Sequence, residues 1–512
     1  MKRLFFILLM AGVFSPAAVV AQDGQNPIRY SSLAQQFSTI NTNGDANATA
    51  LPSVAVQNGF GSFLYNPASM ALIGMSYFNT GLLSNYAEQS NSYLGNSTSF
   101  DNNNTRFGNI GLIYSVPTER GSLVVGGGYT INNQINRTNI LSAYNEQSTI
   151  TDVFKNEASD YNDIAFEAYA IDYVDVEQTT LESIFRIGFT PANFPGIQQE
   201  AEIKQRGSVG EYSIFMATEV QRNLFIGASL GVTYGDYSYE RYFLETDSEN
   251  AYNGDFIDTD NEGNGGTDVA DILLEDQFDS EIVGANIRAG LLYKLLPNIN
   301  VGASFLLPTR FVVTEDYYSE ITTNLDDGRT PFGDSYTGEF SYSVRRPGQL
   351  NLGLALEDIN GFTVSTAVEI IDYRNTDIDL TRDNDLEFRD IAALREQEAA
   401  FDSVMKADYN LVTNLKAGLK YKSDTGFEIR GGFGILPGKS SSYSADKIVL
   451  SGGLGIPLSR ELYLDVTTQY TRWNDRSILY EYFDAQSGQE RSESINETIS
   501  HINLMVGFKY RF

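Results

Sequence analysis

Short stretches in which apolar and polar residues alternate recur along the chain. The last one reads SHINLMVGFKYRF, and every second residue from Ile502 to Phe512 is apolar. The same period of two marks NIGLIYSV from residue 109, NLGLALE from 351 and NLKAGLKYK from 414. Successive side chains of a β-strand point to opposite faces, so these stretches predict strands with one apolar and one polar face. A soluble β-sandwich has the same period, with its apolar face turned toward a core.

The connections between the predicted strands are of two kinds. Very short polar turns begin at residues 117, 220, 296, 357, 423 and 458, with the sequences PTERG, VQRN, LPN, EDING, SDTG and LSRE. Much longer polar segments lie near 136–204, 247–277, 319–335, 381–407, 436–444 and 484–490. Outer-membrane barrels have short turns at the periplasmic end and long loops at the outer end. The two kinds of connection therefore favour a barrel over a sandwich.

The number of strands also fits a barrel. One strand is expected at about 75–90, two flank each short turn and one ends the chain, which gives about fourteen, and such barrels use even numbers. We therefore predict an all-β fold, a transmembrane antiparallel β-barrel of about 14 strands over residues 73–512. Its apolar face would contact lipid, and the terminal aromatic residues would join the girdle at the inner membrane interface.

Three segments depart from the strand pattern. Residues 152–174 and 387–409 have amphipathic helical patterns, and we expect short helices there at the outer mouth. Residues 22–72 fit no strand, yet apolar side chains gather between Phe60 and Met70. A disordered leader is one interpretation, but this apolar content favours a packed plug, or hatch, inside the lumen.

Residues 1–21 have the pattern of a secretory signal peptide. Lys2 and Arg3 precede an apolar run shorter than the ~20 residues of a spanning helix, and small residues near Ala21 offer a cleavage site. The rest of the chain is therefore expected outside the cytoplasm, in the bacterial outer membrane. The chain has no cysteine, so it can form neither disulfides nor thiolate metal sites.

Charge and candidate chemistry narrow the function classes. The net charge of -31, from 66 acidic and 35 basic residues, opposes binding to nucleic acid. Acidic residues gather at 258–268, but Val269 stands where an EF-hand-like loop needs Glu, so no metal site or cofactor is expected. His501 is the only histidine, and no G-x-S-x-G motif accompanies it. We expect no catalytic residue and no enzyme.

The stretch YNPASM places Asn66, Pro67 and Ala68 in the predicted hatch. An Asn-Pro-Ala motif in an N-terminal plug, followed by about fourteen strands, resembles the FadL/TodX family of outer-membrane channels for hydrophobic compounds. The resemblance implies that the hatch lies inside the barrel. It also implies that substrate is captured at the outer surface and leaves sideways, beside a kinked third strand. An ordinary turn is the other interpretation of Asn-Pro.

Two further sets of residues are candidates for parts of such a channel. Gly207 and Gly210 lie close together in the strand that we count as the third, where glycines commonly mark a bend, although they also suit the strand's outer end. Alternation places several cations on the lumen face. They could receive a carboxylate headgroup or simply be solvated. The four candidates for headgroup binding are Arg288, Lys416, Lys420 and Arg430.

The family resemblance implies passive uptake of hydrophobic small molecules, such as long-chain fatty acids or aromatic hydrocarbons. The expected partners are that substrate, outer-membrane lipid, lipopolysaccharide and the barrel-assembly machinery, and the expected state is a monomer. Two alternatives stay open. One is a structural barrel or surface adhesin with long acidic outer loops, and the other is a general porin for polar solutes.

The terminal aromatic residue generates a first prediction. Phe512 resembles the C-terminal signal by which bacterial outer-membrane proteins are recognised for assembly. Deleting Phe512 should reduce the heat-modifiable folded barrel in the membrane fraction severalfold, measured by gel shift, because recognition is weakened. Export across the inner membrane should be unchanged. Undiminished assembly would contradict this role.

Overall fold

The computed structural model describes most of the chain. The described residues are 45, 52–155, 161–175, 177, 179–189, 193–252, 257–258, 266–331, 333–382, 388–442, 444–484 and 488–512. The expected signal peptide, most of the expected hatch before residue 52 and most of the acidic segment 258–268 lie outside these residues.

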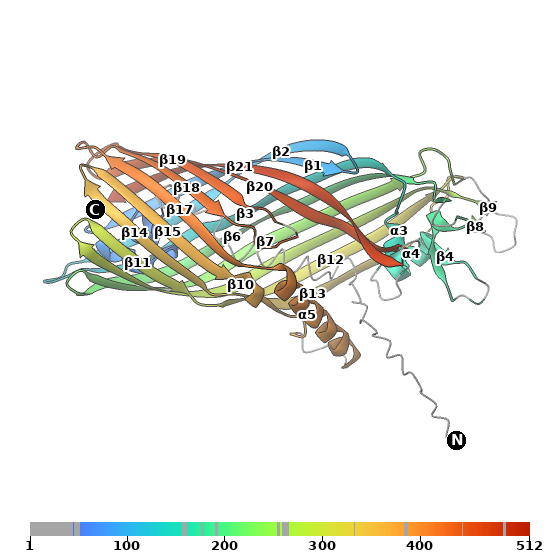
Figure 1. Ribbon diagram of the computed structural model, residues 1–512, viewed down its shortest axis with the longest axis horizontal. Helices are drawn as coiled ribbons and strands as arrows, with labels where there is room; N and C mark the ends of the chain where they lie inside the picture. Colours follow the sequence, from blue (N-terminus) through green and yellow to red (C-terminus); the bar gives the residue numbers. More distant parts are fainter. Residues whose placement is uncertain are drawn as a thin grey trace, which may run out of the picture.

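The strands form a closed antiparallel barrel of fourteen, as predicted (Figure 1). Three of the fourteen are each broken into two pieces, β11 with β12, β13 with β14 and β15 with β16. Each strand pairs with the next along the chain, and β21 pairs with β1 to close the wall. The strands are β1 Tyr77–Tyr93, β2 Asn96–Val116, β3 Leu123–Asn145, β6 Ile197–Gln221, β7 Leu224–Thr246, β10 Val269–Leu296, β11 Ile299–Leu306, β12 Thr309–Leu325, β13 Ser335–Arg346, β14 Gln349–Ile359, β15 Phe362–Asp372, β16 Asp377–Asp379, β17 Leu411–Lys422, β18 Glu428–Leu436, β19 Lys447–Pro457, β20 Leu462–Asp484 and β21 Gln489–Arg511.

Helices and short strand pairs fill the lumen and the outer end. They are η1 Phe60–Leu64, η2 Pro67–Leu72, α3 Thr151–Phe154, α4 Asn162–Glu167, β4 Ile171–Tyr173, β5 Leu181–Ser183, η3 Ile184–Arg186, β8 Ile257–Asp258, β9 Gly266–Thr267, η5 Tyr373–Asn375 and α5 Phe388–Asp408. The helices predicted near 152–174 and 387–409 are thus present, the first as two short pieces. No helix in the described part of the chain has the length and apolar character needed to cross a membrane.

The alternation predicted from the sequence is confirmed in the wall. On β7, Ile226, Leu230 and Val232 are exposed on the outer face, while Ser229 and Thr233, at odd-numbered positions, are buried on the inner face. An exposed apolar band on a barrel is the surface that lipid covers.

The strands are longer than the predicted loops allowed, so the boundaries 136–204 and 247–277 are wrong. β3 runs to Asn145, β6 starts at Ile197, and β10 spans 28 residues, whereas ~9–11 residues cross a membrane. On β7 the outward side chains change from apolar to polar at Asp236, while pairing with β6 and β10 continues to Thr246. The apolar signal therefore ends at the lipid boundary, but the strand does not.

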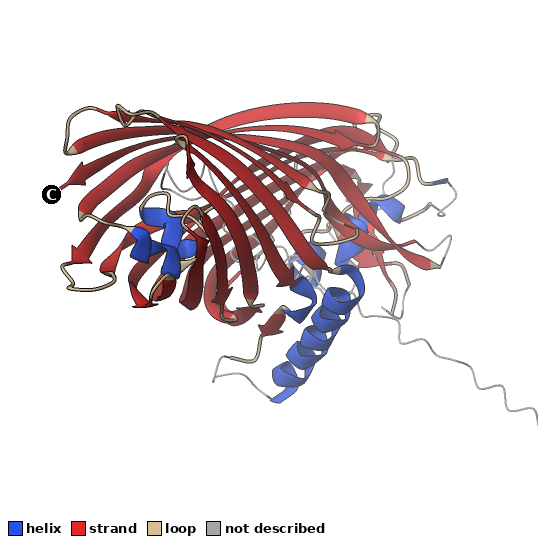
Figure 2. Ribbon diagram, turned by 60° about the vertical axis from the view of Figure 1, so that its left-hand side comes forward, coloured by secondary structure: helices blue, strands red, loops and turns tan. Residues whose placement is uncertain are grey.

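The wall is tall on one side and low on the other (Figure 2). β14, β15, β17, β18 and β19 have only 9 to 12 residues, and α5 lies at their outer ends (Figure 1). Two of the three breaks between strand pieces contain Pro308 and Pro347, where the backbone cannot donate to a ladder, and the third contains η5. The outer mouth is therefore cut obliquely.

Above the lipid band the tall strands enclose a second hydrophobic core with α3 and α4. Glu245 near the end of β7 is fully buried beside this core. Its carboxylate accepts hydrogen bonds from the backbone N–H of Ile150 at 2.8 Å and from Gln199 Nε2 at 2.7 Å. Burial nevertheless raises the pKa of Glu245 to about 7, because a low dielectric disfavours the charged form.

The second prediction concerns the pH dependence of this outer core. The folded-state pKa of Glu245 is raised above its value of 4.5 in an unfolded chain, so the carboxyl group favours folding of the outer core below pH 4.5. That contribution should fall as pH rises through about 7, by about 3 kcal/mol in total. Between pH 5 and 8, the hydrogen exchange rate at residues 148–152 should therefore rise by a larger factor than the intrinsic exchange rate of an unfolded peptide. In Glu245→Gln the exchange rate should rise only as the intrinsic rate does. If the wild type and this variant show the same pH dependence, the prediction is wrong.

Candidate functional site

Residues 52–73 lie inside the barrel, at the end that carries the short turns. Apolar side chains of η1 and η2 are buried against the inner faces of strands β2, β3, β6, β7 and β10. The ring of Phe63 stacks on Phe215 of β6 at 5.1 Å, and Phe60 meets Phe63 edge-on at 5.3 Å. The segment therefore packs as a small core within the lumen.

The Asn-Pro-Ala motif holds this segment to itself and to the wall. Asn66 is fully buried and caps η2 by accepting a hydrogen bond from the N–H of Ala68 at 3.0 Å. Its Nδ2 donates to the carbonyl oxygens of Val54 at 2.6 Å and of Leu291 in β10 at 3.1 Å. Pro67 occupies the first helical position, where its fixed φ and missing donor suit the turn. The motif does more than form a turn.

Two glycines of the wall make room for the motif. A Cβ on Gly290 of β10 would collide with Asn66 Oδ1, and one on Gly227 of β7 would collide with the backbone of Pro67. Glycine allows this close backbone approach because it has no side chain. Sequence reasoning missed the close contact of these two positions with the motif, since glycines are frequent in all the predicted strands.

Polar side chains of the low wall also hold residues 52–73. Ser365 donates to the carbonyl of Pro52 at 2.7 Å, and Asn351 donates to the carbonyl of Tyr65 at 3.2 Å. Each such bond contributes about 1 kcal/mol net. Apolar packing and several modest hydrogen bonds therefore hold residues 52–73 in the lumen, with no covalent link.

Of the four cations proposed to bind a headgroup, Lys420 and Arg430 are cross-strand partners on β17 and β18, but none of the four lines the cavity described below. Each already has a partner in the barrel. Arg288 makes a bidentate pair with Glu211 at 2.5 and 2.8 Å. The other pairs are Lys416 with Glu369 at 3.2 Å, Lys420 with Asn58 Oδ1 at 3.0 Å and Arg430 with Asp465 at 2.9 Å. The observed contacts are those of structural residues.

The two candidate kink glycines lie in β6, which is the fourth barrel strand and not the third. Gly207 and Gly210 pair with β7 without interruption. The register shifts instead on β3, between Ile131 and Asn133, directly opposite Gly210. The expected strand at about 75–90 and the two strands that flank the turn at 117 come before it, so calling this strand the third was a miscount.

The third strand, β3, is where the wall ladder is interrupted. Its backbone pairs with β2 only from Leu123 to Thr130. Farther out, side chains take over: Asn96 donates to the carbonyl of Ser142 at 2.9 Å, and Asn102 donates to Asn136 at 2.9 Å. A run of three glycines, GGG at 126–128, stands just before the interruption. That run is the sequence signal for the irregularity.

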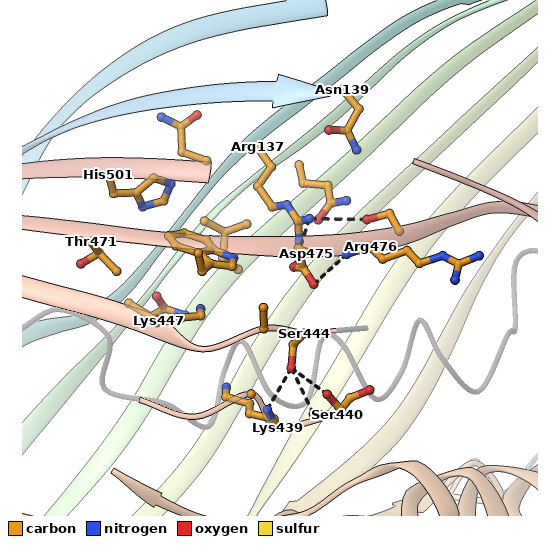
Figure 3. A pocket seen from close by; sticks show the side chains of 18 of the residues that line it. Arg137, Asn139, Lys439, Ser440, Ser444, Lys447, Thr471, Asp475, Arg476 and His501 are labelled. Carbon is orange, nitrogen blue, oxygen red and sulfur yellow. Dashed lines mark hydrogen bonds and ion pairs between the residues drawn. The ribbon is translucent and has the colours of Figure 1, made fainter. Parts of the chain in front are cut away.

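A cavity of about 290 Å³ lies in the outer half of the lumen, between the tall strands and the rim of the low wall (Figure 3). Its volume is close to the lower end of typical ligand pockets. Carboxamides form much of its polar lining, and apolar groups such as Ile203, Phe278 and Val449 complete it. The carboxamide residues include Asn85, Asn133, Gln134, Asn136, Asn139 and Asn503.

Cations also reach this cavity, from strands other than those predicted. Arg137 of β3 binds Glu497 at 2.7 Å and Asp475 at 3.3 Å. Figure 3 shows Lys447 and His501 on the same side of the cavity, on strands that flank β20. The arrangement offers cationic and amide groups beside an apolar surface, which suits an amphiphilic ligand better than a reaction.

Comparisons with known proteins bear on the fold. The toluene transporter TodX of Pseudomonas putida aligns with a TM-score of 0.50 and 14% identity, covering 91% of this chain and 98% of TodX. The barrel has the fold of these channels. A FadL homologue of Pseudomonas aeruginosa aligns equally well, at 0.50 and 12% identity over 92% and 97% of the two chains. No family model and no curated protein sequence matches this chain.

The third prediction tests whether Arg288 is structural. Glu211→Gln leaves a buried guanidinium without its carboxylate, so the variant should lose about 3–5 kcal/mol of unfolding free energy. The measurement is urea unfolding in lipid vesicles. The matched control is Asp379→Asn, which breaks an exposed pair with Arg310 and should cost less than about 1 kcal/mol.

A double variant separates pairing from ligand binding. Replacing both Glu211 and Arg288 by Met removes both charges and should recover most of the lost stability. A double variant as unstable as Glu211→Gln would contradict the structural role.

Proposed function

We propose that the protein is a passive outer-membrane channel for hydrophobic small molecules. The observation that carries the proposal is the Asn66 motif, buried inside a barrel of the TodX and FadL-homologue fold and bonded to its wall. TodX is a toluene transporter. Barrel, plug and cavity together suit selective passage of an organic ligand, with the plug limiting free flow of water and ions.

The proposed route has three stages. Ligand reaches the cavity through the oblique mouth and rests against its apolar side. Residues 52–73 then shift as a hatch, which requires breaking only hydrogen bonds and apolar contacts. The ligand leaves through the wall where β3 loses its ladder with β2, beyond Thr130, or past the hatch into the periplasm. No step requires energy input or a chemical reaction, and we propose no catalytic residue.

The proposal includes the location and partners expected from the sequence. The protein would be exported with residues 1–21 as a cleaved signal peptide and assembled as a monomer by the barrel-assembly machinery, with Phe512 as part of the signal. Lipid and lipopolysaccharide would surround the apolar band. Phe512 is exposed at the inner end, and its N–H donates to the carbonyl of Ser76 at 3.3 Å.

The fourth prediction loosens the hatch without touching the wall. Replacing Asn66 and Pro67 by Ala removes three hydrogen bonds and a fixed backbone angle, about 2–3 kcal/mol of seating energy. The double variant should assemble normally, lose most uptake of a hydrophobic probe such as radiolabelled toluene or oleate, and show larger or noisier single-channel conductance.

The chain offers a matched control for this variant. Pro297 and Asn298 are the same two residue types in reverse order, in the turn between β10 and β11. Replacing both by Ala should change neither uptake nor conductance. If the Asn66 and Pro67 variant also matches the wild type in both, the hatch role fails. Steady ion conductance by the wild type would favour a general porin. An adhesin would be favoured if neither protein takes up the probe and both bind equally well at the cell surface.

A further inference from the structure

The inner face of three neighbouring strands gathers an unusual set of side chains. Ile448 of β19 pairs with Arg472 of β20, so Lys447 lies beside Trp473, and Thr471 of β20 pairs with His501 of β21. Lys447 Nζ sits 4.1 Å from the centre of the Trp473 ring, and the His501 ring meets the same indole edge-on at 5.0 Å. All three residues line the cavity.

Lys447 differs from the other lumen cations. Within the described part of the chain it makes no ion pair with a carboxylate, and its one close contact is the Trp473 ring. The nearby Asp475 is already bound by Arg137 at 3.3 Å. An ammonium group in a semi-enclosed cavity is costly unless an anion compensates it, and a ring face compensates only in part. The ammonium group of Lys447 can therefore pair with one anion supplied by a ligand in the cavity.

Two polar side chains of the same cavity also lack partners. Gln134 of β3 is 9% exposed, and among the residues that the structure describes neither its Oε1 nor its Nε2 has a hydrogen-bond partner. His501 Nε2 is likewise buried and without a partner. Several other cavity carboxamides have partners, and Asn85 donates to Asn503 at 2.7 Å. A buried group without a partner costs about 1–3 kcal/mol, so a ligand that bonds both Gln134 atoms recovers that energy.

We infer that the cavity binds organic acids with an apolar body and a hydroxyl group. The carboxylate pairs with Lys447, the hydroxyl bonds the amide of Gln134, and the body rests on the apolar lining. This inference rests on the proposed channel function and narrows its ligand class. A neutral hydrocarbon would leave the ammonium and the amide uncompensated.

The single tryptophan of the chain makes the site directly observable. The full mature protein in proteoliposomes is titrated with four probes of one chain length: octanoate, 3-hydroxyoctanoate, 1-octanol and octyltrimethylammonium. Because Trp473 contacts Lys447, occupancy should change its fluorescence in a saturable way. We expect 3-hydroxyoctanoate to bind most tightly, then octanoate, with octanol at least tenfold weaker than octanoate and no saturable signal from the ammonium probe.

Variants assign the recognition to named groups. Lys447→Met should weaken both acids about tenfold or more and leave octanol unchanged, whereas Lys447→Arg should retain most of the acid preference. Gln134→Met should abolish the advantage of 3-hydroxyoctanoate over octanoate. The matched control is Lys509→Met, since Lys509 is a lumen lysine that already faces Asp465 at 4.0 Å and does not line the cavity.

The outcomes separate this inference from the channel function. Equal affinity for octanoate and octanol in the wild type, or no effect of Lys447→Met in a barrel that still runs as a heat-modifiable band, overturns the inference. If uptake of a neutral probe persists in that case, the channel function stands. If no probe binds and no uptake occurs, both fail.

Discussion

The absence of hydrogen-bonding partners in lipid is the constraint on which this structure depends. Every backbone N–H and C=O at membrane depth must be paired within the protein, so the sheet has to close on itself. The ladder between β1 and β21, from Tyr77 with Arg511 to Ser92 with Asn496, performs that closure. Irregular backbone is then confined to places that something else covers. The breaks at Pro308 and Pro347 and the unladdered part of β3 are such places.

Closure also divides the side chains into two environments with different rules. The outer face is apolar because lipid covers it, whereas the inner face must satisfy polar groups in a narrow space. The lumen does so by pairing charges, as Arg288 does with Glu211, and by linking carboxamides, as Asn85 does with Asn503. It leaves glycines where another backbone must approach, as at Gly290. Groups that remain without partners after this pairing, such as Gln134, therefore carry information about ligand.

The sequence predicted what depends on local pattern. Alternation and turn spacing predicted the fourteen strands, and an amphipathic helical pattern predicted α5. Apolar content between Phe60 and Met70 favoured a packed plug, and the family resemblance implied the inward position of the Asn66 motif. Strand length was underestimated because alternation of polarity stops where lipid stops, although pairing continues beyond Asp236. The cations were placed on the correct face, but alternation cannot show which carboxylate across the lumen pairs with Arg430. Lys447, Trp473 and Gln134 were missed because three separate strands bring them together. A lone tryptophan on a polar face was the available signal.

The oblique mouth gives the molecule a direction within the membrane plane. Under the proposed channel function, ligand arriving along the cell surface would meet a rim on the side of the low wall and a tall barrier on the other side. Capture therefore depends on the rotational setting of the barrel among its neighbours as well as on ligand concentration. In a crowded outer membrane, a neighbouring protein that contacts β14 to β19 would block the approach of ligand to the low rim. A neighbour that contacts β6 to β10 would leave the rim accessible.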